Sequence, residues 1–220
     1  MAKRLIDVSH EIEAGLVTYP GLPAPAVSDF LSREASRSHY AEGTTFQIGR
    51  IEMVANTGTY LDSPFHRFAE GSDLAALPLE RLADLEGIVI KAIERKSCAL
   101  DADYFEGRDL RGKAVLIRTG WDRHWQTPQY GEGHPFLTRR SAELLAAAAP
   151  ALVGIDSLNI DDTQDGTRPA HTLLLGAGIP VVEHLCNLQA LPVAGFRLHC
   201  APVKFRGVGT FPVRAYAVID

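Results

Sequence analysis

The sequence predicts an α/β protein built on a mixed β-sheet. Short apolar runs rich in β-branched residues recur along the chain, and each is typical of a strand. The runs at 114–117 and 152–155 are apolar throughout, as expected of strands covered on both faces, whereas 47–54 alternates like a half-solvated antiparallel strand. The predicted strands begin near Leu5, Gln47, Gly87, Lys113, Ala151, Ile179 and Pro212.

Two helices are predicted, each leading into a strand. Residues 138–150 ("TRRSAELLAAAAP") combine a threonine that can cap the first amides, high-propensity Ala and Leu, and a final proline that ends the helix. Residues 78–87 ("PLERLADLEG") place a proline in the first turn, leucines near one face and a glycine at the end.

Length and composition indicate a single globular domain over residues 1–220. The chain is 46% hydrophobic and 22% charged, and its net charge of −5 comes without a clustered Lys/Arg stripe, so a small molecule is expected as partner and nucleic acid is not. No apolar run is long enough to cross a bilayer, and no apolar signal core follows the first basic residues, which predicts a cytoplasmic protein without a membrane partner. The cysteines lack C-x-x-C spacing and are expected to be buried free thiols: Cys98, Cys186 and Cys200.

Several local motifs fail when their spacing is checked. "HEIEA" at 10–14 lacks the second histidine of a zincin, and "GAGIPVVE" at 176–183 lacks the third glycine of a dinucleotide loop and leads into a strand. "DDTQDGT" at 161–167 begins like a calcium loop but has threonine at the twelfth place, so it supports calcium only weakly.

The stretch "VANTGTYLDSPFHRF" is the strongest candidate site. On an extended backbone Tyr60 and Asp62 share a face, and Asn56 joins them if the intervening turn permits. Farther along, His171 precedes an apolar stretch and Glu183 ends a predicted strand. A histidine and two carboxylates from three elements can form a site for a hard cation, although sequence separation alone does not show that they meet.

The frame from residue 56 to residue 66 resembles His-x-Gly-Thr-His-x-Asp-x-Pro-x-His, the signature of the cyclase-like metal-dependent hydrolases, the family of bacterial kynurenine formamidase and isatin hydrolase. The similarity extends through "LIDVSHEIEAGLVTYPG", "LPLERL", "VLIRTGW", "GIDSLNID", "AHTLLLGAGIPVVEHLCNL" and "PVRAYAVI". This resemblance implies the swivelling β/β/α architecture and a homodimer or homotetramer, in which the irregular segment 15–40 is suited to reach across a subunit boundary.

The resemblance also implies a set of metal ligands. Family members hold one metal with two signature histidines, an aspartate and a glutamate, and a second with the same carboxylates and a later histidine. The second set is kept here as Asp62, His171 and Glu183, whereas Asn56 and Tyr60 replace the histidines of the first set and are poorer zinc ligands. We therefore expect one divalent ion, Zn or Mn first, with Mg or Fe also compatible.

The function predicted is metal-dependent hydrolysis of a small amide, lactam or lactone. His66, the last signature histidine, would transfer the proton, and Tyr60 would donate a hydrogen bond to the oxyanion. Tyr19, Asn56 and Arg67 are expected to contact the substrate, with Arg206 as another candidate for a substrate carboxylate.

Two alternatives stay open. The first is a metal-free binding protein or pseudoenzyme on the same fold, which the loss of two histidines favours. The second is a lyase or isomerase that uses His66 and Tyr60 as an acid–base pair. The other histidines are expected to be structural, with His184 as a candidate to orient a ligand from beside Glu183.

Overall fold

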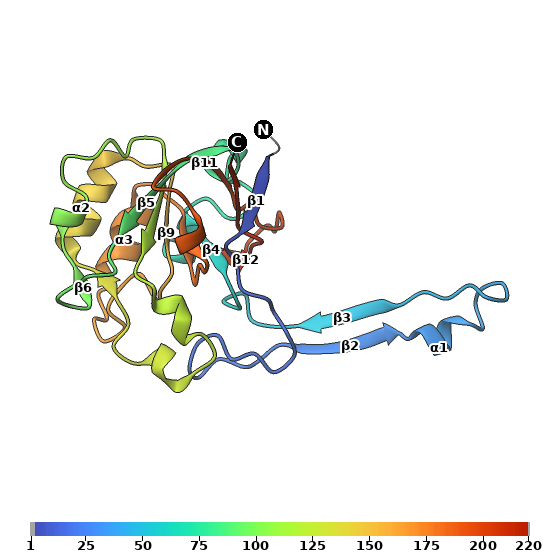
Figure 1. Ribbon diagram of the computed structural model, residues 1–220. Helices are drawn as coiled ribbons and strands as arrows, with labels where there is room; N and C mark the ends of the chain where they lie inside the picture. The colour runs from blue at the N-terminus through green and yellow to red at the C-terminus, as the bar shows by residue number, and fades with distance from the viewer. Residues whose placement is uncertain (1–2, 220) are drawn as a thin grey trace.

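A nine-stranded mixed sheet forms the body of the computed structural model, which describes residues 3–219 (Figure 1). The strand order is β1-β13-β11-β5-β7-β9-β10-β4-β12, with β5, β7, β9 and β10 parallel and the flanking strands antiparallel. The α/β class and the mixed sheet predicted from the sequence are therefore confirmed. The strand bounds are β1 Arg4–Asp7, β4 Tyr60–Asp62, β5 Leu85–Lys91, β7 Ala114–Arg118, β9 Leu152–Ile155, β10 Val181–Glu183, β11 Ala194–His199, β12 Thr210–Pro212 and β13 Tyr216–Ile219.

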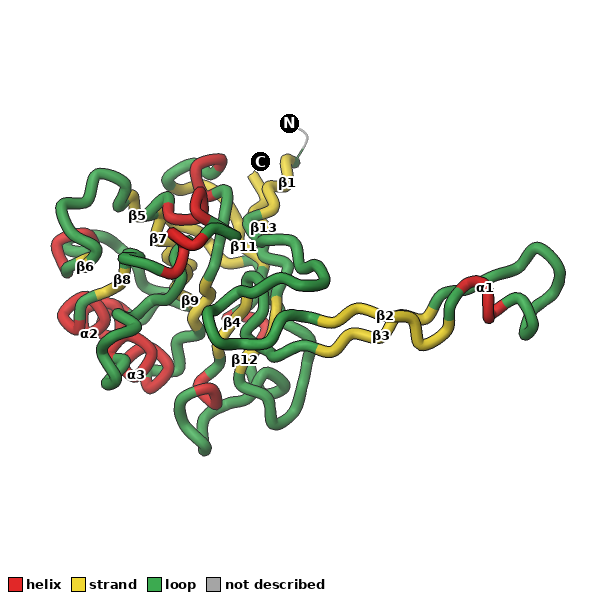
Figure 2. Tube along the Cα trace, turned by 90° about the horizontal axis from the view of Figure 1, so that it is seen from below, coloured by secondary structure: helices red, strands yellow, loops and turns green. Residues whose placement is uncertain are grey.

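Both faces of the central strands are covered, which explains their uninterrupted apolar sequences. Val115 and Ile117 of β7 pack in a cluster with residues of α2 (Arg139–Ala148) and α3 (Pro169–Gly176), which lie side by side on one side of the sheet (Figures 1 and 2). Ala114 and Leu116 alternate with them and join a second cluster on the opposite face. The burial predicted for 114–117 and 152–155 is confirmed, since every residue in both runs is buried.

The helix predicted over 138–150 is confirmed as α2. The Thr138 side chain accepts a hydrogen bond from the Ser141 backbone N–H at 3.2 Å, as an N-cap does. Ala149 then takes a left-handed conformation, with φ 52°, and ends the helix before Pro150.

The helix predicted over 78–87 is wrong. Only a 3-10 turn forms there, at Leu79–Arg81, and β5 already begins at Leu85. Asp84 has φ 54°, a left-handed backbone that no α-helix contains. From Leu85 onward the chain pairs with β11, and from Gly87 also with β7, so sheet partners override the local helix propensity.

A β-hairpin arm projects from the body (Figures 1 and 2). It consists of β2 (Ala26–Leu31), the short helix α1 (Arg33–Ser36) and β3 (Ile48–Glu52), with β2 and β3 antiparallel. The segment predicted to be irregular thus contains regular structure, and the predicted half-burial of the strand at 47–54 is wrong, because every residue of β3 is exposed. The exposed large apolar side chains of the arm are Val27, Phe30, Tyr40, Phe46, Ile48 and Ile51.

The remaining elements are short. A small two-stranded sheet pairs β6 (Ala99–Leu100) with β8 (Phe136–Leu137). All three cysteines are free thiols, but the burial predicted for them is confirmed only for Cys200 and is wrong for Cys98 and Cys186, which are half-buried. Within residues 3–219 no helix has both the length and the apolar character to span a membrane. The other 3-10 turns are Pro64–His66, Ala102–Tyr104, Trp121–His124, Pro128–Gly131 and Leu188–Ala190.

Candidate metal centre

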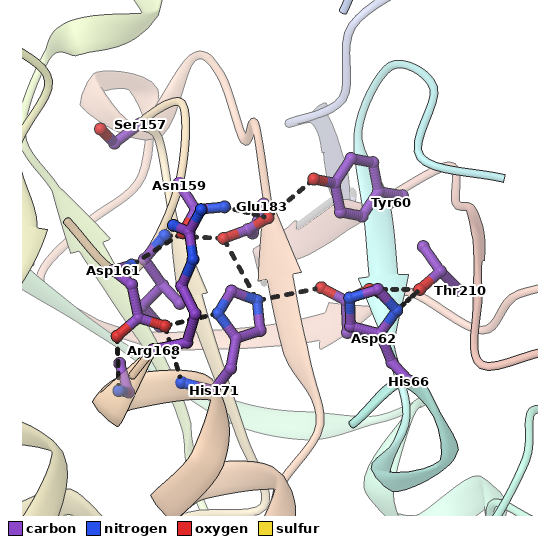
Figure 3. A network of polar contacts seen from close by, with 12 residues as sticks. Tyr60, Asp62, His66, Ser157, Asn159, Asp161, Arg168, His171, Glu183 and Thr210 are labelled. Atoms are coloured by element: carbon purple, nitrogen blue, oxygen red, sulfur yellow. Dashed lines mark hydrogen bonds and ion pairs between the residues drawn. The ribbon is translucent and has the colours of Figure 1, made fainter. Parts of the chain in front are cut away.

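The candidate centre lies where β4, β10 and the start of α3 meet (Figure 3). The β4 and β10 strands pair antiparallel, with Tyr60 opposite Glu183. Tyr60 and Asp62 both face the centre, as expected for alternate residues of one strand: the Tyr60 hydroxyl contacts Glu183, and the Asp62 carboxylate faces His171. The structure thus brings together side chains that lie far apart in the sequence.

His171 is placed like a metal-binding histidine. Its Nε2 atom lies 3.5 Å from Asp62 Oδ2 and 3.6 Å from Glu183 Oε1. Its Nδ1 atom lies 2.6 Å from Oδ2 of Asp161, so this second nitrogen is held by a carboxylate, as is usual for a ligating imidazole. All four side chains are buried.

One carboxylate oxygen at this place is left without a partner. Asp62 Oδ2 is buried and accepts no hydrogen bond from any residue within 3–219. A buried acceptor without a donor is costly, and a cation beside it would remove that cost. Donor atoms of Asp62, His66 and His171 lie within 4.8 Å of one another, and Glu183 Oε1 lies 3.6 Å from His171 Nε2, so the donor types present fit the divalent metal that the sequence implies.

His66 borders the same centre from the 3-10 turn after β4. Its Nδ1 atom lies 2.8 Å from the Thr210 hydroxyl and 3.8 Å from Asp62 Oδ1. The ligand atoms of Asp62, His66 and His171 all lie within 4.8 Å of one another, so the geometry offers His66 as a ligand as well as a proton carrier. Its side chain is 37% exposed, which leaves one edge of the ring accessible.

Tyr60 stands where the resemblance places a histidine ligand, and it engages Glu183 instead. Its hydroxyl donates to Glu183 Oε2 at 2.7 Å, while His184 Nε2 lies 3.3 Å from the same hydroxyl and the Tyr130 hydroxyl lies 2.8 Å from His184 Nδ1. Burial, with the charges of Glu183 and Asp62, raises the pKa of the Tyr60 hydroxyl well above its ordinary value. Tyr60 is therefore a neutral donor. His184 orients Tyr60 and not Glu183 directly.

The electrostatics of the centre are those of two carboxylates around one cationic group. Burial raises the pKa of Glu183 to about 7, although the charge of His171 acts in the opposite direction. Burial also opposes ionisation of Asp62, yet the close approach of His171 and the charge of His66 outweigh it and lower the pKa. Burial disfavours the His171 imidazolium, but Glu183, Asp161 and Asp62 together raise its pKa to about 10. A divalent ion and the His171 Nε2 proton therefore compete for one place.

A pocket of about 420 Å³ opens onto the centre. The three residues expected to contact substrate all line it, namely Tyr19, Asn56 and Arg67, together with Tyr60, His66, His171 and Glu183. Arg206 is exposed and does not belong to this lining. The volume suits a small molecule.

Four residues of the site were missed in the sequence. Asn159 and Arg168 line the pocket, Asp161 holds His171, and Thr210 bridges Asp62 and His66. Asn159 and Asp161 follow β9, the parallel neighbour of β10, and the carboxyl ends of parallel strands meet at one edge, so that signal was available. Thr210 and Arg168 carry no comparable signal.

The fold and the centre together define an α/β protein with a candidate divalent-metal site at the ends of its strands. The chain belongs to the cyclase family, because residues 6–162 match the family model described as "Putative cyclase". It is 26% identical over 216 residues to kynurenine formamidase of Bacillus cereus, an alignment that covers 96% of this chain and 95% of that protein.

Solved structures share the whole fold. A protein described as a potential metal-dependent hydrolase with cyclase activity superimposes with a TM-score of 0.82 at 23% identity, covering 100% of this chain and 99% of that chain. Isatin hydrolase A from Ralstonia solanacearum gives a TM-score of 0.83 at 22% identity, covering 99% of this chain and 92% of that chain. The resemblance inferred from the sequence is confirmed.

Proposed function

We propose that the protein is a metal-dependent hydrolase that acts on the C–N bond of a small amide or lactam, or on a related lactone. One observation carries the proposal: Asp62 Oδ2, His171 Nε2 and Glu183 Oε1 converge, buried, at the base of a pocket that His66 also lines. Membership of the cyclase family and the likeness to kynurenine formamidase and isatin hydrolase support the same class.

We further propose a single divalent ion, Zn or Mn before Mg or Fe. Asp62, His171 and Glu183 would hold it, with His66 as an alternative fourth donor. The Tyr60 hydroxyl already occupies Glu183 Oε2, and neither Asn56 nor Tyr60 offers an imidazole for a second ion. The chemistry that such an ion supplies when bound is polarisation of a carbonyl and acidification of water to a pKa of about 7.

The hydrogen bonds of Thr210 assign the proton chemistry of His66. The Thr210 hydroxyl has one hydrogen, which it donates to Asp62 Oδ1, so its oxygen accepts from His66 Nδ1–H. The neutral ring then keeps its lone pair on Nε2, the nitrogen available to take a proton from water and return it to the leaving nitrogen. Thr210 thereby fixes the tautomer that a general base requires.

Tyr60 receives a different assignment from the one that its sequence position suggests. Its only hydroxyl hydrogen is directed at Glu183, so we assign Tyr60 to holding that carboxylate. The oxyanion role stays a prediction, because it requires this hydrogen bond to break.

The test combines metal analysis with turnover. Protein purified without chelator should carry close to one equivalent of a transition metal and should hydrolyse members of a panel of aryl formamides and lactams. His66→Ala should abolish turnover and retain the metal. No metal, and no recovery on adding Mn or Zn, would favour the metal-free binding protein. Products that are isomers or eliminated fragments would favour the lyase or isomerase, and a metal lost in His66→Ala would make His66 a ligand.

We also propose that the arm joins two or more copies of this chain into a homodimer or homotetramer. Six large apolar side chains are exposed on an arm that no other part of residues 3–219 covers. A second copy is the partner always present at equal concentration, and burial of these side chains is the available driving force. A cytoplasmic location and the lack of nucleic-acid and membrane partners stay predictions.

A further inference from the structure

Arg168 occupies a backbone conformation that an arginine rarely adopts. It precedes α3 with φ 46° and ψ 62°, in the left-handed region that favours glycine. Such strain persists only where the surrounding structure holds it, and it is concentrated at functional sites. Here it accompanies a side chain that lines the pocket and extends toward Asn159 (Figure 3).

The guanidinium of Arg168 is weakly satisfied by the protein. Its Nη1 atom lies 3.5 Å from Asn159 Oδ1 and 3.3 Å from the Asp162 carbonyl oxygen, both long for hydrogen bonds of a charged donor. A guanidinium has five N–H donors, and within residues 3–219 the other nitrogens of Arg168 have no hydrogen-bond partner. The side chain is half-buried, so protein and solvent together leave some of these donors available to a ligand in the pocket.

A second arginine, Arg67, contacts the first turn of α3. Arg67 Nε donates to the Thr172 hydroxyl at 3.2 Å, and its guanidinium lies 5.3 Å from the centre of the Phe68 ring. The two Nη groups remain for a ligand. Like Arg168, it has no carboxylate within 4.0 Å among residues 3–219, and both arginines line the pocket.

The charges of the pocket are therefore divided. The carboxylates of Asp62 and Glu183 both face His171 Nε2 at the base, where its proton or a divalent ion would lie between them. Neither guanidinium group has a carboxylate within 4.0 Å among residues 3–219, and a planar guanidinium is the side chain best shaped to bind a carboxylate through two parallel hydrogen bonds. Tyr19, Pro20 and Leu22 supply an apolar wall for the body of a ligand.

We propose that the pocket selects small substrates that carry a carboxylate, with Arg168 as the residue that binds this group and Arg67 as its second donor. The inference rests on the proposed function, since it names the substrate class of that hydrolase. It also explains the left-handed backbone, which sets the direction of the Arg168 side chain.

Binding of a matched pair of fluorescent probes tests the inference without turnover. Anthranilate and 2-aminobenzamide have nearly the same shape and differ by the negative charge. Metal-loaded wild type should bind anthranilate at least about tenfold more tightly than 2-aminobenzamide, because losing a charge-assisted hydrogen bond costs at least this factor in affinity. Equal affinities, or a preference for the amide, would overturn the proposal.

Arg168→Gly is the decisive variant. Glycine suits the left-handed backbone, so the variant should fold with unchanged circular dichroism, while the anthranilate preference should fall to within about twofold. Arg168→Lys, which keeps the positive charge but loses the paired N–H donors of the planar guanidinium, should retain part of the preference for anthranilate. Arg206→Gln removes an exposed arginine outside the pocket and should change nothing. A preference that survives in Arg168→Gly would overturn the proposal.

Protein treated with a chelator shows whether the arginines or the metal bind the carboxylate of the probe. The preference for anthranilate should persist after chelator treatment. If chelator abolished the preference while Arg168→Gly retained it, the metal would be the group that binds the carboxylate, and the proposal would be overturned. Failure of the proposed function appears differently. A preserved, Arg168-dependent preference without hydrolysis of any amide would contradict the hydrolase alone, and hydrolysis without any charge preference would contradict only the present inference.

Discussion

The Nδ1 atom of His171 lies 2.6 Å from Oδ2 of Asp161, and the same carboxylate accepts the backbone N–H groups of Ala170 and His171. One buried side chain thus fixes both the imidazole and the first turn of α3. Because Nδ1 is engaged in this way, Nε2 is the nitrogen that faces Asp62 and Glu183.

Asp161→Asn should therefore weaken metal binding without removing a ligand. The amide offers one acceptor in place of two oxygens, so the His171 ring loses its fixed orientation, and we expect metal affinity to fall by about 10- to 100-fold. Loss of the buried acceptor should also lower the free energy of unfolding by about 1–3 kcal/mol. Competition with a chromogenic chelator measures the first effect and urea denaturation the second.

Asp162→Asn is the matched control, because among residues 3–219 that carboxylate accepts a hydrogen bond only from the N–H of Gln164 and lies outside the His171 contact. Equal metal affinity in wild type and Asp161→Asn would show that Asp161 serves α3 alone.

Replacing Asn56 and Tyr60 by histidine together should raise the metal content from about one equivalent to two. The change frees Glu183 Oε2 from the Tyr60 hydroxyl and supplies two imidazoles, which are strong ligands of Zn. Equilibrium dialysis followed by elemental analysis measures the stoichiometry. Tyr60→Phe frees the same oxygen but supplies no ligand, so this variant should still bind about one equivalent of metal. Two equivalents already in wild type would contradict the one-metal centre.

His10 should make the fold less stable as the pH falls. Its ring stacks on Trp125 with centroids 3.9 Å apart, and its buried Nε2 has no partner among residues 3–219. Burial lowers the pKa of His10 from 6.5 to about 4. The unfolded chain therefore binds this proton first, so the stability contribution is complete above pH 6.5 and is lost as the pH falls through 6.5 toward 4.

His10→Phe keeps the stacked ring and removes the titration. Its free energy of unfolding should decline less steeply between pH 6.5 and pH 4, by at most about 1.4 kcal/mol per pH unit, as follows from one proton. Urea denaturation at pH 7, 6 and 5 measures the slopes. His39→Phe alters an exposed histidine and should leave the slope as in wild type. Parallel curves for His10→Phe and wild type would contradict the burial argument.

Phe30→Asp and Ile51→Asp together should dissociate the proposed oligomer. These side chains are 75% and 65% exposed on the arm, and a carboxylate placed at an apolar contact between copies opposes association. Sedimentation velocity measures the mass. Leu79→Asp, on the body at 65% exposure, is the control and should leave the mass unchanged. A wild-type protein that sediments as a monomer would contradict the proposal.

The fold was largely predictable where local and global preferences agree. The unbroken apolar run 114–117 is typical of a strand covered on both faces, and Thr138 caps α2 by a contact three residues away. The prediction failed for 78–87, where Leu79 of the 3-10 turn is exposed, while Leu82 after the turn and Leu85 of β5 enter the core. There the choice depends on β7 and β11, which no window of sequence contains.

The sequence pointed to side chains that the structure brings close together, but not to the residues that hold them in place. Similarity to a family signature pointed to Asp62, His171 and Glu183, and the structure places them together. Thr210 and Arg168 were missed because their importance arises from contacts with distant segments and from a backbone angle, neither of which a residue type reveals. Their role follows only from three-dimensional geometry.

The hydrogen bond between Asp62 and Thr210 joins positions 148 residues apart, with Thr210 on the next-to-last strand. A nascent polypeptide consequently cannot complete this centre until Thr210 has been synthesised. Until then the Asp62 carboxylate lacks the hydroxyl that hydrogen-bonds to it. A truncated product that ends before β12 would therefore be inactive, even if its other strands had folded correctly.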